Sequence, residues 1–166
     1  MMAPMAECPR IMSKLAILRH GTSNPHTCLL TLDGEIQMKR IGGKIANIRD
    51  AGQSTLIIAS TAPRALASAK VLGEVDVLNA PVEGHEVLWS DREHPMRLGE
   101  AYTLIQTAGK RADLVVAVTH LEYAQDLPEY VGERDGISVL PWESDIRKGC
   151  GFLLDYMSKA TTPLKW

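Results

Sequence analysis

The stretch KLAILRHG, residues Lys14–Gly21, decides the fold of this chain. A short apolar run ends abruptly in a cation, an imidazole and a glycine. This pattern is typical of a buried strand whose carboxyl end delivers two polar side chains to a turn. Open α/β sheets bind their ligands at that end of the strands. Arg19 and His20 are therefore the first candidates for a functional site.

Two later stretches repeat this design. Thr55–Ala59 is an apolar run that leads into Ser60 and then Arg64, and Leu114–Val118 is an apolar run that leads to His120. If these strands are parallel neighbours, their carboxyl ends meet at one edge of a sheet. The predicted site then consists of Arg19, His20, Ser60, Arg64 and His120.

These residue types suit a tetrahedral anion. Guanidinium groups offer planar forks that match the oxygens of a phosphate, and charge-assisted hydrogen bonds are roughly twice as strong as neutral ones. Two imidazoles beside the anion permit covalent catalysis, with one as nucleophile and the other donating hydrogen bonds to the transferred group. The residues therefore predict phosphoryl transfer through a phosphohistidine.

The order and separation of four motifs, from about Leu15 to His120, resemble the histidine phosphatase superfamily, the phosphoglycerate-mutase-like proteins. The motifs are Arg19–Gly21 after the first strand, Leu30–Gly34 opening the next helix, Ser60 with Arg64–Ala65 and Ser68–Ala69, and Val118–His120. The resemblance implies a three-layer α/β/α sandwich with a mostly parallel central sheet. The chain departs from the family pattern at Thr22, Thr61 and Leu121.

The mechanism that this resemblance implies has four main participants. His20 attacks the phosphorus in line and is transiently phosphorylated, while Arg19, Arg64 and His120 stabilise charge on the equatorial oxygens. Ser60 and Asn24 are further candidate phosphate-binding residues. We expect no metal and no other cofactor, because two arginines beside the histidines would repel a cation.

A proton donor for the leaving oxygen is normally a carboxylic acid with a raised pKa. Asp91 matches the family position best, and Glu93 and Glu86 compete with it. Arg92 is a candidate substrate contact, with a surface salt bridge as its alternative. The alternative that the site has no such acid also stays open, because a nitrogen leaving group has less need of a proton donor. We assign Glu122 first to a helix surface, with lining of the pocket as its alternative.

The chain is short and has no long insertion between Arg64 and His120, which favours a phosphatase over a mutase. The substrate is either a small phosphomonoester or a phosphorylated protein. A protein phosphohistidine phosphatase is the alternative enzyme. The departures from the family pattern leave a non-catalytic phosphate-binding or regulatory domain as the competing class.

Composition limits the remaining possibilities. The 166 residues predict one domain over residues 13–166, preceded by a flexible tail over residues 1–12. A net charge of −2 and a single Phe make nucleic-acid binding improbable. Three cysteines without paired spacing favour the cytoplasm, and no membrane anchor is evident. The sequence does not indicate an oligomeric state.

Outside the motifs, the pattern predicts several weaker elements. We expect a strand over Asp76–Ala80, bounded by Pro81, and short strands over Ile137–Leu140 and Gly151–Tyr156. Pro128 is expected to start or kink a helical turn.

Overall fold

The computed structural model describes residues 11–140 and 146–166. The elements, in chain order, are β1 (Lys14–Arg19), α1 (Leu32–Ile48), β2 (Thr55–Ala59), α2 (Pro63–Gly73), β3 (Val82–Gly84), the 3-10 turn η1 (Glu86–Leu88), α3 (Leu98–Gly109), β4 (Leu114–Thr119), α4 (Leu121–Asp135), β5 (Gly151–Asp155) and β6 (Ala160–Leu164).

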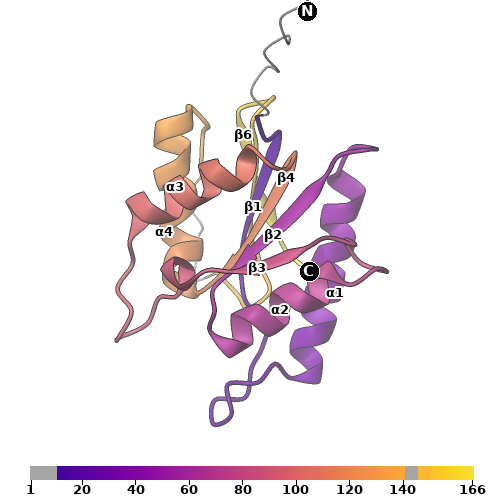
Figure 1. Ribbon diagram of the computed structural model, residues 1–166, viewed down its shortest axis with the longest axis vertical. Coiled ribbons are helices and arrows are strands. Elements are labelled where there is room, and N and C mark those ends of the chain that lie inside the picture. The colour runs from indigo at the N-terminus through magenta and orange to yellow at the C-terminus, as the bar shows by residue number, and fades with distance from the viewer. Residues whose placement is uncertain (1–10, 141–145) are drawn as a thin grey trace, which may run out of the picture.

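A six-stranded sheet in the order β3-β2-β4-β1-β5-β6 forms the middle layer. The first four strands in that order are mutually parallel, and β5 and β6 run antiparallel to their neighbours. Helices α1 and α2 cover one face of the sheet, and α3 and α4 cover the other (Figure 1). This confirms the predicted three-layer sandwich with a mostly parallel sheet.

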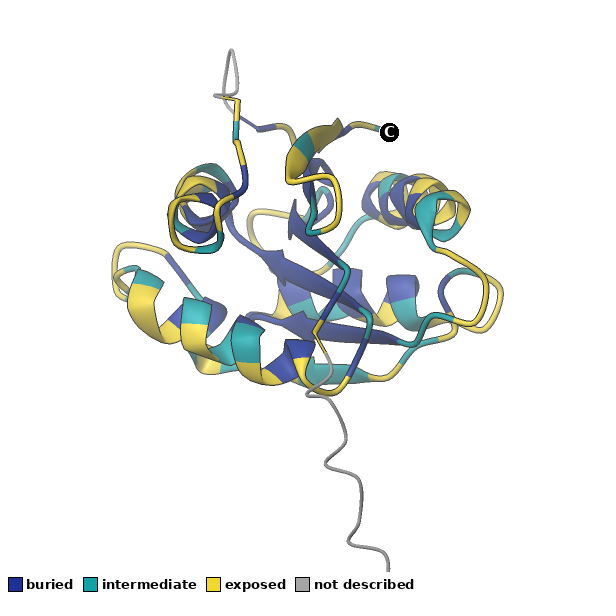
Figure 2. Cartoon of the chain, turned by 90° about the horizontal axis from the view of Figure 1, so that it is seen from above, coloured by how far each residue is buried: buried dark blue, intermediate teal, exposed yellow. Residues whose placement is uncertain are grey.

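The core consists of two apolar layers, one on each side of the sheet. Met38 and Ile41 of α1 pack into one layer, and Ile105 of α3 and Val131 of α4 pack into the other. The central strands are therefore buried on both faces (Figure 2), which is why their sequences read as continuous apolar runs.

The start of α1 is fitted closely against the turn that follows β1. Thr31 caps the helix, because its Oγ1 accepts a hydrogen bond of 3.1 Å from Gly34 N. A Cβ atom on Gly34 would lie 2.2 Å from the Thr22 carbonyl oxygen, and one on Gly21 would lie 2.8 Å from the Gly34 carbonyl oxygen. Only glycine permits this approach, which fixes the turn carrying His20.

The strand expected over Asp76–Ala80 is wrong. Residues 75–78 form a turn, closed by hydrogen bonds from Val77 N to the Glu74 carbonyl and from Leu78 N to the Leu72 carbonyl. Strand β3 begins only after Pro81. Leu78 is buried, so its apolar character reflects core packing from a turn rather than from a strand.

Two further expectations on the second half of the chain are also corrected. Instead of a strand over Ile137–Leu140, a single bridge joins Ser138 to Ala160. Pro128 lies inside α4 rather than at the start of a helix. Its position there is buried against the core, and this packing offsets the missing backbone donor.

Residues 1–10 of the expected tail lie outside the described residues. Met12, which we placed in that tail, is only 2% exposed. A Cβ atom on Gly109 at the end of α3 would lie 3.0 Å from the Met12 sulfur. Met12 therefore belongs to the packed domain, because the α3 glycine leaves space for its side chain.

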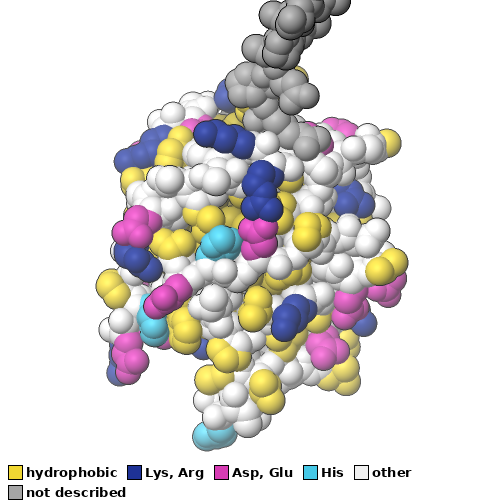
Figure 3. All heavy atoms as spheres, in the orientation of Figure 1, with side chains coloured by type: hydrophobic (Ala, Val, Ile, Leu, Met, Phe, Trp, Pro, Cys, Tyr) yellow, Lys and Arg dark blue, Asp and Glu magenta, His cyan; other side chains and the backbone are white. Residues whose placement is uncertain are grey.

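The surface mixes charges of both signs. On the face drawn in Figure 3, Lys and Arg side chains are interspersed with Asp and Glu. Among the described residues, no helix combines the length and apolar character needed to cross a membrane.

Candidate active site

The predicted site residues lie at the carboxyl ends of three parallel strands. Arg19 ends β1, and His20 follows it; Arg64 lies in the first turn of α2 after β2. His120 follows β4 as the N-cap of α4. Backbone hydrogen bonds from His20 N to the Thr119 carbonyl (2.9 Å) and from Ser60 N to the Val118 carbonyl (3.0 Å) join the three ends.

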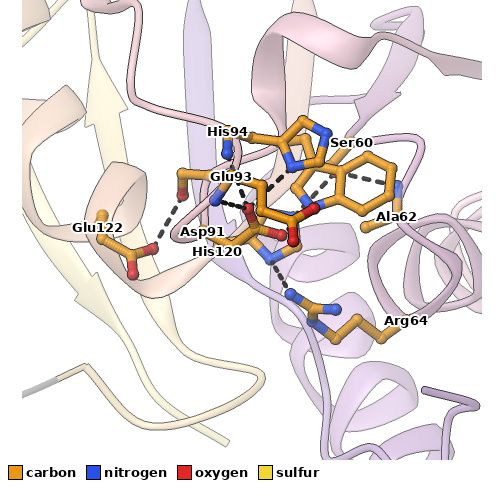
Figure 4. A network of polar contacts seen from close by, with 10 residues as sticks. Ser60, Ala62, Arg64, Asp91, Glu93, His94, His120 and Glu122 are labelled. Atoms are coloured by element: carbon orange, nitrogen blue, oxygen red, sulfur yellow. Dashed lines mark hydrogen bonds and ion pairs between the residues drawn. The ribbon is translucent and has the colours of Figure 1, made fainter. Parts of the chain in front are cut away.

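Arg64 bridges the two imidazoles. Its Nε donates a hydrogen bond of 3.1 Å to His20 Nε2, and its Nη2 lies 3.2 Å from His120 Nδ1. The two histidine rings meet edge to face with centroids 5.3 Å apart. Figure 4 shows the guanidinium of Arg64 pointing at His120. The convergence predicted from the sequence is therefore present.

The hydrogen bonds also fix the tautomer of each ring. His20 Nδ1 lies 2.8 Å from the Gly21 carbonyl oxygen, and a carbonyl only accepts, so Nδ1 carries the proton and Nε2 carries a lone pair. His120 Nδ1 accepts from Arg64, which leaves the proton on Nε2, 2.9 Å from Ser60 Oγ. The lone pair of His20 therefore faces the arginine fork.

Both histidines are neutral at pH 7. Burial lowers the pKa of His20 to about 4, aided by the charges of Arg64, Arg19 and Lys148 and opposed by the Gly21 carbonyl. Burial also lowers the pKa of His120 to about 3, aided by His20 and Arg64. A neutral His20 has the free electron pair that a nucleophile requires.

Two serines hold the site residues in place through hydrogen bonds. Ser60 is fully buried, and its Oγ accepts hydrogen bonds from His120 Nε2 and from Ala62 N at 3.1 Å. Ser68 accepts from Gly21 N (3.0 Å) and donates to the Arg64 carbonyl (2.8 Å). Ser60 therefore orients His120, and Ser68 joins the turn after β1 to the helix that carries Arg64.

A cavity of about 470 Å³ opens over these groups. The predicted site residues that line it are Arg19, His20, Asn24, Arg64, Asp91 and His120. Arg19 also donates from Nη1 to the Ile146 carbonyl at 2.7 Å. Asn24 uses its Oδ1 to accept from His26 N (2.8 Å) and Thr27 N (3.2 Å), so this side chain also stabilises its own loop.

Asp91 lines the cavity, but it is not an acid with a raised pKa. Its carboxylate accepts hydrogen bonds from His94 Nδ1 (2.8 Å), Trp89 Nε1 (2.7 Å) and the backbone N–H groups of Glu93 and His94. The His94 side chain contributes most to holding the pKa of Asp91 well below its usual range. The loop folds around a charged carboxylate (Figure 4), and this overturns the expected raised pKa.

The remaining predicted residues of this loop lie elsewhere. Arg92, Glu86 and Glu93 are exposed and are not among the residues that line the cavity.

Two further charged residues line the cavity, of which Glu122 was expected there only as an alternative and Lys148 was not expected. Glu122 lies in the first turn of α4, and its Oε2 accepts a hydrogen bond of 2.8 Å from Ser90 Oγ. Lys148 lies in the turn before β5. The position of Glu122 two residues after His120 was a usable signal, whereas no sequence motif marks Lys148.

Among the described residues, no group of three or more His, Cys, Asp or Glu side chains is arranged to hold a metal ion. The nearest candidates for ligands, His20 and His120, are both engaged by the Arg64 guanidinium. The site therefore offers cations and neutral imidazoles, a set that suits an anion.

Comparison with known proteins supports the fold. No protein-family model matches the chain, and no curated protein matches its sequence. A solved structure titled as the protein histidine phosphatase SixA complexed with tungstate shares 19% identity, with a TM-score of 0.60 over 92% of this chain and 94% of that one.

Two other solved structures are similar to the same extent. A putative phosphohistidine phosphatase SixA from Agrobacterium tumefaciens has 15% identity and a TM-score of 0.59 over 92% of this chain and 96% of that one. A mycobacterial glucosyl-3-phosphoglycerate phosphatase has 15% identity and a TM-score of 0.58 over 93% and 98%. The chain therefore has the fold of the histidine phosphatases, as its motifs implied.

Proposed function

We propose that this protein is a metal-independent phosphatase that acts on a small phosphomonoester or a phosphorylated protein through a phosphohistidine at His20. The observation that carries the proposal is the arginine fork of Arg64, which spans His20 Nε2 and His120 Nδ1. A guanidinium and two imidazoles are thereby gathered at one point, and these are groups that can bind and receive a phosphoryl group.

The reaction proceeds in two displacements. His20 Nε2 attacks the phosphorus, the N–P bond forms, and the bond to the leaving group breaks. Arg19 and Arg64 stabilise charge on the transferred group, and His120 does so once its Nδ1 takes up a proton, because its Nε2 proton is directed at Ser60. Water then attacks the phosphorus, the N–P bond breaks, and orthophosphate leaves while His20 recovers its lone pair.

Proton transfer is the step for which two carboxylates compete. Asp91 is held in its charged form, so it has no proton to give to the leaving oxygen, and its lowered pKa also makes it a weak base. Among the described residues, Glu122 is the other carboxylate that lines the cavity. An oxygen ester needs a proton donor, and Glu122 is then the remaining candidate of these two.

A protein phosphohistidine phosphatase is the second candidate function. A nitrogen leaving group makes little demand on a carboxylic acid, and the lowered pKa of Asp91 suits such a substrate. The likeness to the SixA protein histidine phosphatase supports the same reading. A non-catalytic phosphate-binding domain is the competing class, and it requires no nucleophile.

A hydrolysis assay with p-nitrophenyl phosphate distinguishes the phosphatase hypothesis from the hypothesis of a non-catalytic phosphate-binding domain. We expect wild type to release p-nitrophenol, His20→Ala to be inactive, and His26→Ala to match wild type, because His26 is exposed in the loop after β1. A screen of phosphorylated metabolites and one phosphohistidine protein then distinguishes the two substrate classes. Hydrolysis that survives His20→Ala contradicts the proposed mechanism.

A further inference from the structure

Among the described residues that line the cavity, one cation is not used by the proposed reaction. Lys148 lines the cavity together with the histidines and arginines. We propose that Lys148 forms a second anion subsite, which holds a carboxylate or a second phosphate group of the substrate. This inference rests on the proposed function, and it narrows the substrate to a phosphomonoester that carries a further acidic group.

The sheet topology places Lys148 on a defined side of His20. Along the sheet edge, Arg64 follows β2, His120 follows the adjacent β4, and His20 follows the next strand, β1. Because β5 is antiparallel to β1, its start lies at the same edge, and Gly151 pairs with Leu18. Lys148 therefore lies on the side of His20 that is opposite to Arg64.

The turn that carries Lys148 is fixed by several contacts. Gly149 N donates to the carbonyls of Arg19 (3.1 Å) and His20 (3.0 Å), and Trp166 Nε1 donates to the Lys148 carbonyl at 2.8 Å. Gly149 has a φ of +74°, and a Cβ atom there would lie 3.0 Å from Gln37 Cβ. The backbone of the subsite is thus ordered before any ligand binds, which lowers the cost of binding.

The charge of Lys148 is available to a ligand. Within the parts of the chain that the structure describes, no carboxylate lies within ion-pair distance of its ammonium. The positive charge of Lys148 also helps to lower the pKa of His20. Because Lys148 and His20 line the same cavity, one ligand can contact both.

The size of the cavity also calls for more than one phosphoryl group. Its volume of about 470 Å³ falls within the range of roughly 300–1,000 Å³ that is typical of small-molecule sites. Arg19 and Arg64 already supply guanidinium donors for the oxygens of the phosphoryl group, and His120 lines the cavity beside them. Lys148 is surplus to that group, and a compact ammonium suits a carboxylate or phosphate as a point charge.

Calorimetric binding of two matched probes tests the subsite. Phosphonoacetate carries a carboxylate beside its phosphonate, and ethylphosphonate has a similar size without the second charge. We expect wild type to prefer phosphonoacetate by about tenfold or more, the value of one charge-assisted hydrogen bond. Lys148→Met should reduce that preference to about twofold or less, and Lys148→Arg should retain most of it.

Lys110→Met, an exposed lysine at the end of α3, is the matched control and should keep the wild-type preference. Thermal unfolding confirms that each variant is folded. Equal weakening of both probes by Lys148→Met would mean that Lys148 binds the phosphoryl group itself, which overturns the subsite. A wild type without any preference overturns it as well.

Binding of orthophosphate shows whether only the subsite proposal has failed or the proposed function has failed as well. A wild type that binds orthophosphate and hydrolyses p-nitrophenyl phosphate, but does not prefer phosphonoacetate, retains the function and loses the subsite. A wild type that binds neither orthophosphate nor either probe loses both.

Discussion

Arg64 Nε donates its hydrogen bond directly to His20 Nε2, the nitrogen that we propose as the nucleophile, over 3.1 Å. The guanidinium thus lies where an oxygen of a bound phosphoryl group would take its donors. Binding of phosphate must replace the Arg64–His20 hydrogen bond with Arg64–phosphate bonds, and this exchange frees the lone pair of His20 at the moment when it is needed.

Replacement of Arg64 tests this bridge. Arg64→Ala should lower kcat/KM for p-nitrophenyl phosphate by roughly 10²–10³-fold, the usual cost of one removed transition-state donor. Arg64→Lys should be nearly as poor, because one ammonium cannot span both imidazoles as the fork does. Arg97→Lys, on an exposed arginine before α3, should match wild type. A fully active Arg64→Lys enzyme would contradict the role of the fork.

The lowered histidine pKa values predict how stability depends on pH. His20 has a pKa of about 4 in the folded protein and about 6.5 when unfolded, so between these values the unfolded chain binds the extra proton. The contribution of neutral His20 to the free energy of unfolding is therefore fully present above about pH 6.5. It falls by roughly 3 kcal/mol as the pH decreases towards 4. Urea unfolding at pH 7 and at pH 4.5 measures this loss.

His20→Gln supplies the comparison for that experiment. This variant should show a smaller drop in the free energy of unfolding between the two pH values, because it lacks one of the two depressed groups. His120 remains, with a pKa of about 3, so part of the drop should persist. An unchanged drop in His20→Gln would mean that His20 titrates normally in the folded protein.

Ser60 is predicted to position His120 rather than to touch substrate. Ser60→Ala removes the acceptor for both His120 Nε2 and Ala62 N, and we expect kcat to fall by about tenfold or more, since unmade buried hydrogen bonds cost roughly 1–3 kcal/mol. Ser60→Thr keeps the hydroxyl and should recover much of the rate. Ser158→Ala, at an exposed position, is the control. Equal rates in all three variants would exclude this role.

The two cavity carboxylates should differ in their effects. Glu122→Gln should slow hydrolysis of an alkyl phosphate such as glycerol 2-phosphate more than that of p-nitrophenyl phosphate, because the poorer leaving group needs a proton. Asp91→Asn should not show that dependence on the leaving group, since its carboxylate is held charged. The reverse pattern in steady-state rates would restore Asp91 as the acid.

The central strands and their polar ends could be predicted because they depend on local sequence. Strands β1, β2 and β4 are buried on both faces, so continuous apolar runs in the sequence identify them. The types of the polar residues that follow each run indicate the chemistry of the site. Strand β3 could not be found in this way. It has three residues, and the core contact of Leu78 comes from the preceding turn.

The environment of the charged residues depended on tertiary structure. The groups that lower the pKa of Asp91 are its own sequence neighbours His94, Glu93 and Trp89, but their residue types alone do not specify that the loop turns so that they donate to the Asp91 carboxylate. Lys148 reaches the site only because β5 returns antiparallel beside β1 and Gly149 contacts Arg19 and His20. Residues brought together by the return of the chain carry no periodic signal in the sequence.

Trapping of the phosphoenzyme tests the central claim most directly. Wild type should be incubated with a ³²P-labelled phosphomonoester that the substrate screen identifies, quenched rapidly and mapped by mass spectrometry. We predict label on His20 that is stable in alkali and labile in acid, and no label in His20→Ala. Turnover of that substrate with label on another residue, or with equal label in His20→Ala, would contradict the account.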